Sequence, residues 1–211
     1  MSPQPLSIAM KDLSIELTKR RTPRDLAKFS QEYKQWVSEN DLQAGLLRME
    51  KDYKFFIDEV WPLSNFCSVV LDESYEIEPI KGNQGYDARV YKSGVFQFNI
   101  EIAYPHDGQA RAQNARRLVK NGVSPLKISS PSNLITTLKK IKDVCKKKSK
   151  KDYSDSVLLF NIATGAVNEA QVEEFLPAMQ EVQKVVEKCS FKARSVYLYF
   201  SPFKKVVKVN A

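Results

Sequence analysis

The segment from Tyr86 to Gly108, YDARVYKSGVFQFNIEIAYPHDG, restricts the possible folds of this chain more than any other. A short strand that ends at Tyr91 is followed by the turn sequence Lys92–Gly94 and then by a longer strand in which apolar and polar side chains alternate. The pattern predicts a β-hairpin. Every second residue of its longer strand lies on one face, which is mainly polar: Gln97, Asn99, Glu101 and Ala103.

Two carboxylates stand out in this hairpin. The alternation allows a register in which Asp87 and Glu101 are neighbours on one surface of the sheet. Carboxylates on adjacent strands can share a hard metal ion such as Mg²⁺, which takes oxygen ligands and keeps several waters. The alternative is a polar face that simply meets water, as antiparallel sheets commonly have.

The charge of the chain points to an anionic partner. The 211 residues, 43% of them hydrophobic, are enough to bury a core. Lys and Arg number 33 against 25 acidic residues, a formal net charge of +8. Nucleic acid is the commonest partner of such a protein, and a basic, soluble protein without a nucleic-acid partner is the alternative.

Cysteine and histidine counts exclude several classes of site. Three widely spaced cysteines and a single histidine cannot make a zinc finger or ribbon, and they favour a reducing compartment. No 18-residue apolar run occurs, and residues 1–21 mix charged with apolar side chains. We therefore expect a cytoplasmic protein with no membrane partner. No phosphate-binding loop, dinucleotide fingerprint or nucleophile elbow is present.

Helices are expected before the hairpin. An imperfect amphipathic pattern suggests one over residues 7–19, and Thr22 as N-cap with Pro23 at the first helical position predicts a second that extends to residue 39. A third is predicted over residues 42–60, with Pro62 marking its end. A strand is expected over residues 68–80.

Basic residues gather on two helices expected after the hairpin. One lies between Asp107 and Gly122, and the other covers residues 131–151. Such runs are either solvated helix faces or surfaces that neutralise backbone phosphates, in which case binding depends strongly on salt. The candidate phosphate contacts are Arg111, Arg116, Arg117, Lys120, Lys139, Lys140, Lys146, Lys147 and Lys148.

The C-terminal part predicts buried strands joined by a helix. SVLLFNI, residues 156–162, is almost continuously apolar, as is typical of a central strand covered on both faces. A helix over residues 168–189 and strands over residues 195–200 and 206–209 follow. The expected fold is an α/β protein with a mixed β-sheet, an antiparallel meander plus a parallel strand, flanked by helices.

This order of elements resembles a known nuclease family. A helix with Glu50, a meander with Asp87, a Glu101-x-Ala103 triplet fourteen residues later, and then a helix and an apolar strand are similar to the restriction-endonuclease-like, or PD-(D/E)XK, superfamily. The similarity covers roughly residues 46–162. It implies a restriction-endonuclease-like core over residues 42–211, preceded by a helical extension over residues 1–41.

The resemblance also implies a metal site. Asp87 and Glu101 would bind Mg²⁺ or Mn²⁺, and Glu50 would complete the site from the preceding helix. The family normally has a lysine where this chain has Ala103. The nearest replacements in sequence are Lys92, His106 and Arg111. His106 is a candidate general base, because an unperturbed histidine titrates near neutral pH, and its alternative is a turn or capping residue.

Three functions follow from these residues. The first is a Mg²⁺-dependent endonuclease that hydrolyses phosphodiesters, with DNA favoured over RNA. The second is a catalytically degenerate nucleic-acid-binding or regulatory module on the same fold. The third is a protein-interaction factor whose basic surface meets an acidic protein. The N-terminal helices, which the resemblance does not cover, either pack on the core or form a homodimer.

Overall fold

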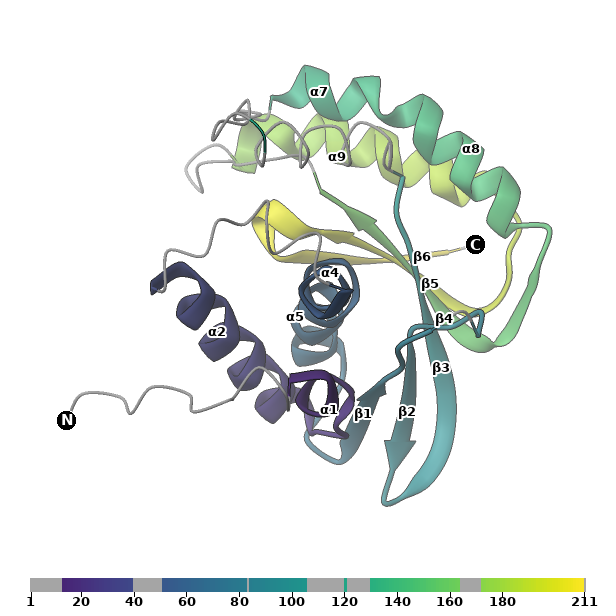
Figure 1. The fold of residues 1–211 in the computed structure, drawn as a ribbon. Helices are drawn as coiled ribbons and strands as arrows, with labels where there is room; N and C mark the ends of the chain where they lie inside the picture. The colour runs from purple at the N-terminus through teal and green to yellow at the C-terminus, as the bar shows by residue number, and fades with distance from the viewer. Residues whose placement is uncertain are drawn as a thin grey trace. The chain divides into compact units, whose positions relative to one another are not determined.

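The strands form one six-stranded mixed sheet in the order β1-β2-β3-β4-β5-β6 (Figure 1). The structure is a computed structural model that describes residues 13–39, 51–82, 84–105, 120, 130–163 and 172–210. Pairing is antiparallel for β1 with β2 and for β5 with β6, and parallel for β3 with β4 and for β4 with β5. The predicted α/β class with a mixed sheet is confirmed. The strands are β1 Tyr75–Pro79, β2 Ala88–Lys92, β3 Val95–Ala103, β4 Asp152–Ile162, β5 Lys192–Phe200 and β6 Lys205–Val209.

The chain divides into two compact units, one of residues 1–97 and 109–124 and the other of residues 98–108 and 125–211. The boundary expected between residues 41 and 42 remains a prediction. The first unit contains the helices α1 Leu13–Thr18, α2 Pro23–Glu39, α4 Lys51–Phe55 and α5 Trp61–Val70, with the π-helix η1 Phe56–Val60 between the last two. The second contains α7 Pro131–Thr136, α8 Leu138–Lys148, α9 Val172–Glu187 and the 3₁₀-helix η3 Ser201–Phe203.

The predicted hairpin is present as β2 and β3. Its turn places Ser93 at φ 51° and Gly94 at φ 78°, both in the left-handed region. Two such residues in succession match the twist of the flanking strands, which is why two-residue hairpin turns favour this geometry. Gly94 adopts it without the steric penalty of a Cβ atom.

Helix α2 begins where its sequence predicts. The backbone N–H of Asp25 donates to Thr22 Oγ1 over 3.3 Å, and the N–H of Leu26 donates to the Thr22 carbonyl over 2.9 Å. Pro23 occupies the first helical position, where a missing N–H costs nothing. Leu26, Phe29 and Tyr33 are buried at spacings of three and four, so one apolar face of this helix lies in the core of this unit.

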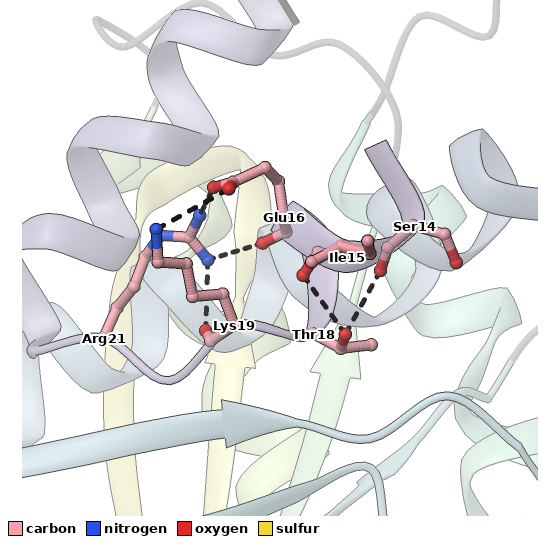
Figure 2. A network of polar contacts seen from close by, with 6 residues as sticks. All are labelled: Ser14, Ile15, Glu16, Thr18, Lys19 and Arg21. Carbon is pink, nitrogen blue, oxygen red and sulfur yellow. Dashed lines mark hydrogen bonds and ion pairs between the residues drawn. The ribbon is translucent and has the colours of Figure 1, made fainter. Parts of the chain in front are cut away.

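Arg21 closes the end of α1 and connects it to the sheet (Figure 2). Its guanidinium donates to the carbonyl of Glu16 over 2.5 Å and to that of Lys19 over 3.0 Å, and it pairs with the Glu16 carboxylate over 2.5 Å. The Arg21 backbone exchanges hydrogen bonds of 3.0 and 2.7 Å with Ile77 of β1. Burial lowers the pKa of Arg21, while Glu16 and Asp25 oppose that effect. One side chain thus satisfies carbonyls that a helix end leaves open.

Two expectations for the segment before the meander are wrong. Pro62 does not end a helix, because η1 runs directly into α5. The N–H of Trp61 bonds to the carbonyl of Phe56, five residues back, and this wider turn gives room for a proline ring that an α-helical turn would exclude. The helix then continues to Val70, so the strand expected from residue 68 begins only at Tyr75.

The helix expected over residues 131–151 is divided at Thr137. The Thr136 hydroxyl donates to the carbonyl of Asn133 over 2.8 Å, and the Thr137 hydroxyl donates to that of Leu134 over 2.6 Å. Such side-chain bonds compete with the helical ladder and bend or interrupt it. Its N-terminal cap is regular, since Ser130 Oγ accepts from the N–H of Asn133 over 3.3 Å.

The core of the second unit lies between α7, α8 and α9 and one face of the sheet (Figure 1). β4 is its centre, with parallel neighbours on both sides. Every residue of β4 from Ser156 to Ile162 is buried, which confirms the central strand that the apolar run predicts. The core residues contributed by the strands are Ala103, Leu158, Phe160, Ile162, Val196, Leu198, Phe200 and Val209.

Candidate functional site

A buried ion pair between Glu101 and Lys148 is the strongest polar feature of the second unit. Glu101 lies in β3, and Lys148 is the last residue of α8. Their charged groups form an ion pair with side chains only 12% and 17% exposed. Charges taken this far out of water persist only when they neutralise each other. The ion pair therefore joins the end of α8 to β3 by an electrostatic interaction.

The surroundings of Lys148 keep it charged. Burial by itself would lower its pKa, but the hydrogen bond and the charge of Glu101, with a smaller contribution from Tyr153, leave the pKa of Lys148 raised. The Tyr153 ring centre lies 5.5 Å from Lys148 Nζ, within the range of a cation–π contact. Tyr153 itself is buried at 4% exposure, so this contact is shielded from water.

The polar face of β3 is covered rather than solvated. Asn99 is 6% exposed, and Ala103 is 2% exposed among Leu134, Ile141 and Cys145. A face that simply meets water, the alternative reading of the strand pattern, is therefore wrong for these positions. Helices pack on the side of β3 that carries the polar residues, and its carboxylate sits in a low-dielectric setting where charge interactions are strengthened.

A second polar contact lies beside the pair, where β4 is irregular. Asn99 Nδ2 donates to Asp155 over 3.1 Å, and Ser156 Oγ donates to the same carboxylate over 2.8 Å. Between Tyr153 and Val157 the register of β4 against β5 shifts, as in a β-bulge. Bulges of this kind re-aim side chains and are enriched near functional sites. Within the described part of the chain, Asn99 Oδ1 is a buried oxygen with no hydrogen-bond partner.

The predicted metal ligands are only partly within the described residues. Asp87 is half-buried just before β2, in the first unit, where its carbonyl accepts from the N–H of Ile80 over 2.9 Å. Glu101 belongs to the second unit. Glu50 and His106 lie outside the described residues. Among the residues that are described, no three of His, Cys, Asp or Glu come together in a group able to hold a metal ion.

The predicted phosphate contacts, too, lie partly within and partly outside the described residues. Four of these lysines are exposed on α8: Lys139, Lys140, Lys146 and Lys147. Lys120 is also exposed. Lys148 differs, because its ammonium is already engaged by Glu101. Arg111, Arg116 and Arg117 lie outside the described residues.

Sequence reasoning missed the inward position of Lys148, although a signal was present. Ile141, Cys145 and Lys148 follow one another at spacings of four and three, so Lys148 continues the apolar stripe of α8 rather than its charged face. Asp155 and Tyr153 carried no comparable signal, because their contacts depend on the irregularity in β4.

Comparison with protein-family models, curated proteins and solved structures finds no significant match. Across the described residues, no helix is both long and apolar enough to span a membrane.

Proposed function

We propose that this chain is a metal-dependent, nuclease-like protein that acts on or binds the phosphodiesters of nucleic acid. The observation that carries the proposal is the Glu101–Lys148 ion pair. It brings an ammonium to the carboxylate that the nuclease-family resemblance assigns to the metal. The motif normally supplies that positive charge two residues after the carboxylate, where this chain has Ala103.

The packing around Ala103 explains why a lysine would come from elsewhere. Ala103 is 2% exposed in the core formed with Leu134, Ile141 and Cys145, where a long cationic side chain has no room. Lys148 projects from the end of α8 to the same strand, two residues before Ala103. Electrostatic stabilisation depends on where the charge stands and not on which element provides it.

The oxygen atoms near the pair suit a hard divalent cation. Glu101 offers a carboxylate, and Asn99, two residues away on the same strand face, has a buried oxygen without a partner among the described residues. Mg²⁺ binds oxygen ligands, often only one or two from protein, and keeps several waters. The oxygen atoms of Glu101 and Asn99 fit Mg²⁺ or Mn²⁺. Lys148 would compete with the ion for Glu101.

The divalent ion and Lys148 would have different roles in phosphodiester cleavage. A bound divalent ion would polarise a phosphoryl oxygen and lower the pKa of a coordinated water. Lys148 would hold its proton, because its pKa is raised, and would therefore place a fixed positive charge beside the negative charge that develops on the phosphate. A lysine that stays protonated at neutral pH is an electrostatic stabiliser rather than a general base.

The test combines metal binding with cleavage. We would titrate Mn²⁺ into wild type, Glu101→Gln and Lys148→Met by calorimetry and assay cleavage of single- and double-stranded oligonucleotides. Glu101→Gln should abolish Mn²⁺ binding, and Lys148→Met should bind Mn²⁺ at least as tightly while losing about 10²–10³-fold in cleavage rate. Lys147→Met, an exposed neighbour on α8, is the matched control. Cleavage unchanged in Glu101→Gln would exclude this site.

A second candidate, a nucleic-acid-binding module without cleavage, is favoured by the exposed lysines of α8. Replacing Lys139, Lys146 and Lys147 with Gln should weaken binding and reduce its salt dependence by about 0.9 in log–log slope per lost duplex contact. The control removes the same number of exposed charges near and within β6: Lys204, Lys205 and Lys208. Binding that is indifferent to salt would rule this candidate out.

A further inference from the structure

An open cleft lies between α2 and the end of α5 in the first unit, where these two helices pack on each other (Figure 1). Its volume is about 440 Å³, and small-molecule sites range from about 300 to 1,000 Å³. The turn before β1 supplies one further residue. The residues that line this α2–α5 cleft are Arg24, Ala27, Lys28 and Gln31 from α2, Ser68 from α5 and Glu73 from the turn.

The sequence of α2 explains why the surface is concave here. Arg24, Ala27, Lys28 and Gln31 are three or four residues apart along the helix, so they share one side of it. Ala27 is half-buried and has only a methyl group, whereas the other three are exposed and have long side chains. The methyl group therefore lies at the base of the cleft, and the long polar side chains stand around it.

The α2 side of the cleft offers hydrogen-bond donors and positive charge. Within the described part of the chain, the Arg24 guanidinium has no hydrogen-bond or ion-pair partner. Lys28 pairs with Glu32 over 4.0 Å, but these side chains are 72% and 44% exposed, and exposed pairs of this kind are weak. The Gln31 amide adds two further N–H donors. An oxyanion such as phosphate could therefore engage both cations without breaking a strong interaction, and a guanidinium binds it in bidentate fashion.

The other side of the cleft offers hydrogen-bond acceptors. The Ser68 hydroxyl donates its proton to the carbonyl of Asn65 over 2.9 Å, so its oxygen is left to accept. Glu73 Oε1 accepts from the backbone N–H of Arg24 over 3.2 Å, and the carboxylate keeps further lone pairs. These two groups suit the hydroxyl groups of a ligand, and the charge of Glu73 would repel a second anionic group there.

We infer that the α2–α5 cleft binds a sugar phosphate, a phosphate monoester that also carries free hydroxyl groups. The phosphate lies against α2, beside Arg24 and Lys28, and the sugar hydroxyls donate to Ser68 and Glu73. Two cations against one carboxylate leave a net positive charge in the lining, which suits an anionic ligand. A bare phosphate would leave the acceptors unused, and a neutral sugar would leave the cations unused. The inference stands on this cleft and does not depend on the proposed function.

The test titrates the isotope-labelled full-length chain with ribose 5-phosphate, inorganic phosphate and ribose at physiological ionic strength and follows amide NMR shifts. Ribose 5-phosphate should bind most tightly and shift the amides of residues 24–31, 68 and 73. Arg24→Gln should weaken its binding by about tenfold or more. Ala27→Leu keeps the helix propensity of α2 but fills the base of the cleft, so it should abolish binding. Lys51→Gln, which removes an exposed charge from α4, is the matched control and should bind as wild type does.

A second titration with adenosine 5′-monophosphate identifies the source of the ligand. Binding of either compound at the same amides supports the inference, and the tighter one shows whether the sugar phosphate is free or part of a nucleotide. Circular dichroism checks that each variant is folded, which is expected because the substituted positions are exposed or half-buried.

Three outcomes would overturn the inference. One is a Kd of wild type above about 10 mM for both sugar phosphates, which would leave the cleft without a ligand of this class. Another is equal weakening by Arg24→Gln and Lys51→Gln, which would show a general effect of net charge rather than a site. The last is inorganic phosphate that binds as tightly as ribose 5-phosphate, which would show that Ser68 and Glu73 take no part in binding.

Discussion

Replacing Lys148 with Met is predicted to destabilise the protein by about 2–4 kcal/mol. Methionine keeps much of the apolar stem but removes the ammonium, so the carboxylate of Glu101, whose side chain is 12% exposed in the pair, loses its counter-ion. Removing one partner of a fully buried pair costs about 3–5 kcal/mol. The remaining exposure lets some water reach Glu101, which brings the expected cost slightly below that range.

The assay is urea unfolding followed by circular dichroism and tryptophan fluorescence. In a chain of this size a decrease of about 3 kcal/mol in the free energy of unfolding corresponds to a fall in Tm of roughly 6–12 °C in a thermal melt. The double variant Glu101→Gln/Lys148→Met removes both charges and should lie within about 1 kcal/mol of wild type, because no uncompensated charge stays buried. Lys147→Met, exposed on the same helix, should change stability by less than about 0.5 kcal/mol.

The same pair predicts how stability depends on pH. Because the folded-state pKa of Lys148 is raised, its contribution is fully present below the unfolded value of about 10.4 and is lost as pH rises through the higher folded value. The stability difference between wild type and Lys148→Met should therefore be constant at neutral pH and shrink in strong alkali. If Lys148→Met and Lys147→Met were equally stable at pH 7, the buried pair would be refuted as a source of stability.

Three further predictions concern the first unit. Thr22→Ala removes the oxygen that caps α2 and should cost about 1 kcal/mol, while Thr22→Ser should be close to neutral in the same urea assay. Gly94→Ala places a Cβ at φ 78° in the hairpin turn and should destabilise by roughly 1 kcal/mol, whereas a cost below the error of the measurement would contradict the turn geometry. Arg21→Ala removes the guanidinium that donates to the Glu16 and Lys19 carbonyls and should raise amide exchange across α1 by tenfold or more, which hydrogen exchange would detect, with Lys28→Ala on α2 as the control.

Local patterns in the chain predicted much of the fold. Thr22 and Pro23 placed the start of α2, the alternation after Gly94 placed β3, and the apolar run around Leu158 placed a strand with neighbours on both sides. Each of these features depends on residues close together in sequence, through capping, strand alternation or continuous burial. Features of this kind can be predicted from the sequence without knowledge of the tertiary contacts.

Other features depended on contacts that only the folded chain makes. Pro62 lies inside a continuous helical segment because a π-helical turn precedes it, and Thr137 interrupts a helix because its hydroxyl bonds to the backbone. The sequence shows a proline and a threonine in both cases but not which backbone geometry surrounds them.

The candidate site shows the same division. Strand alternation by itself determined that Asn99 and Glu101 share a face of β3, and composition determined that the chain is basic. Tertiary structure decided that helices cover that face and that one lysine among many turns inward to Glu101. The physical reason is that a carboxylate on a strand is stable in water or beside a cation, and only packing removes the water and selects the cation.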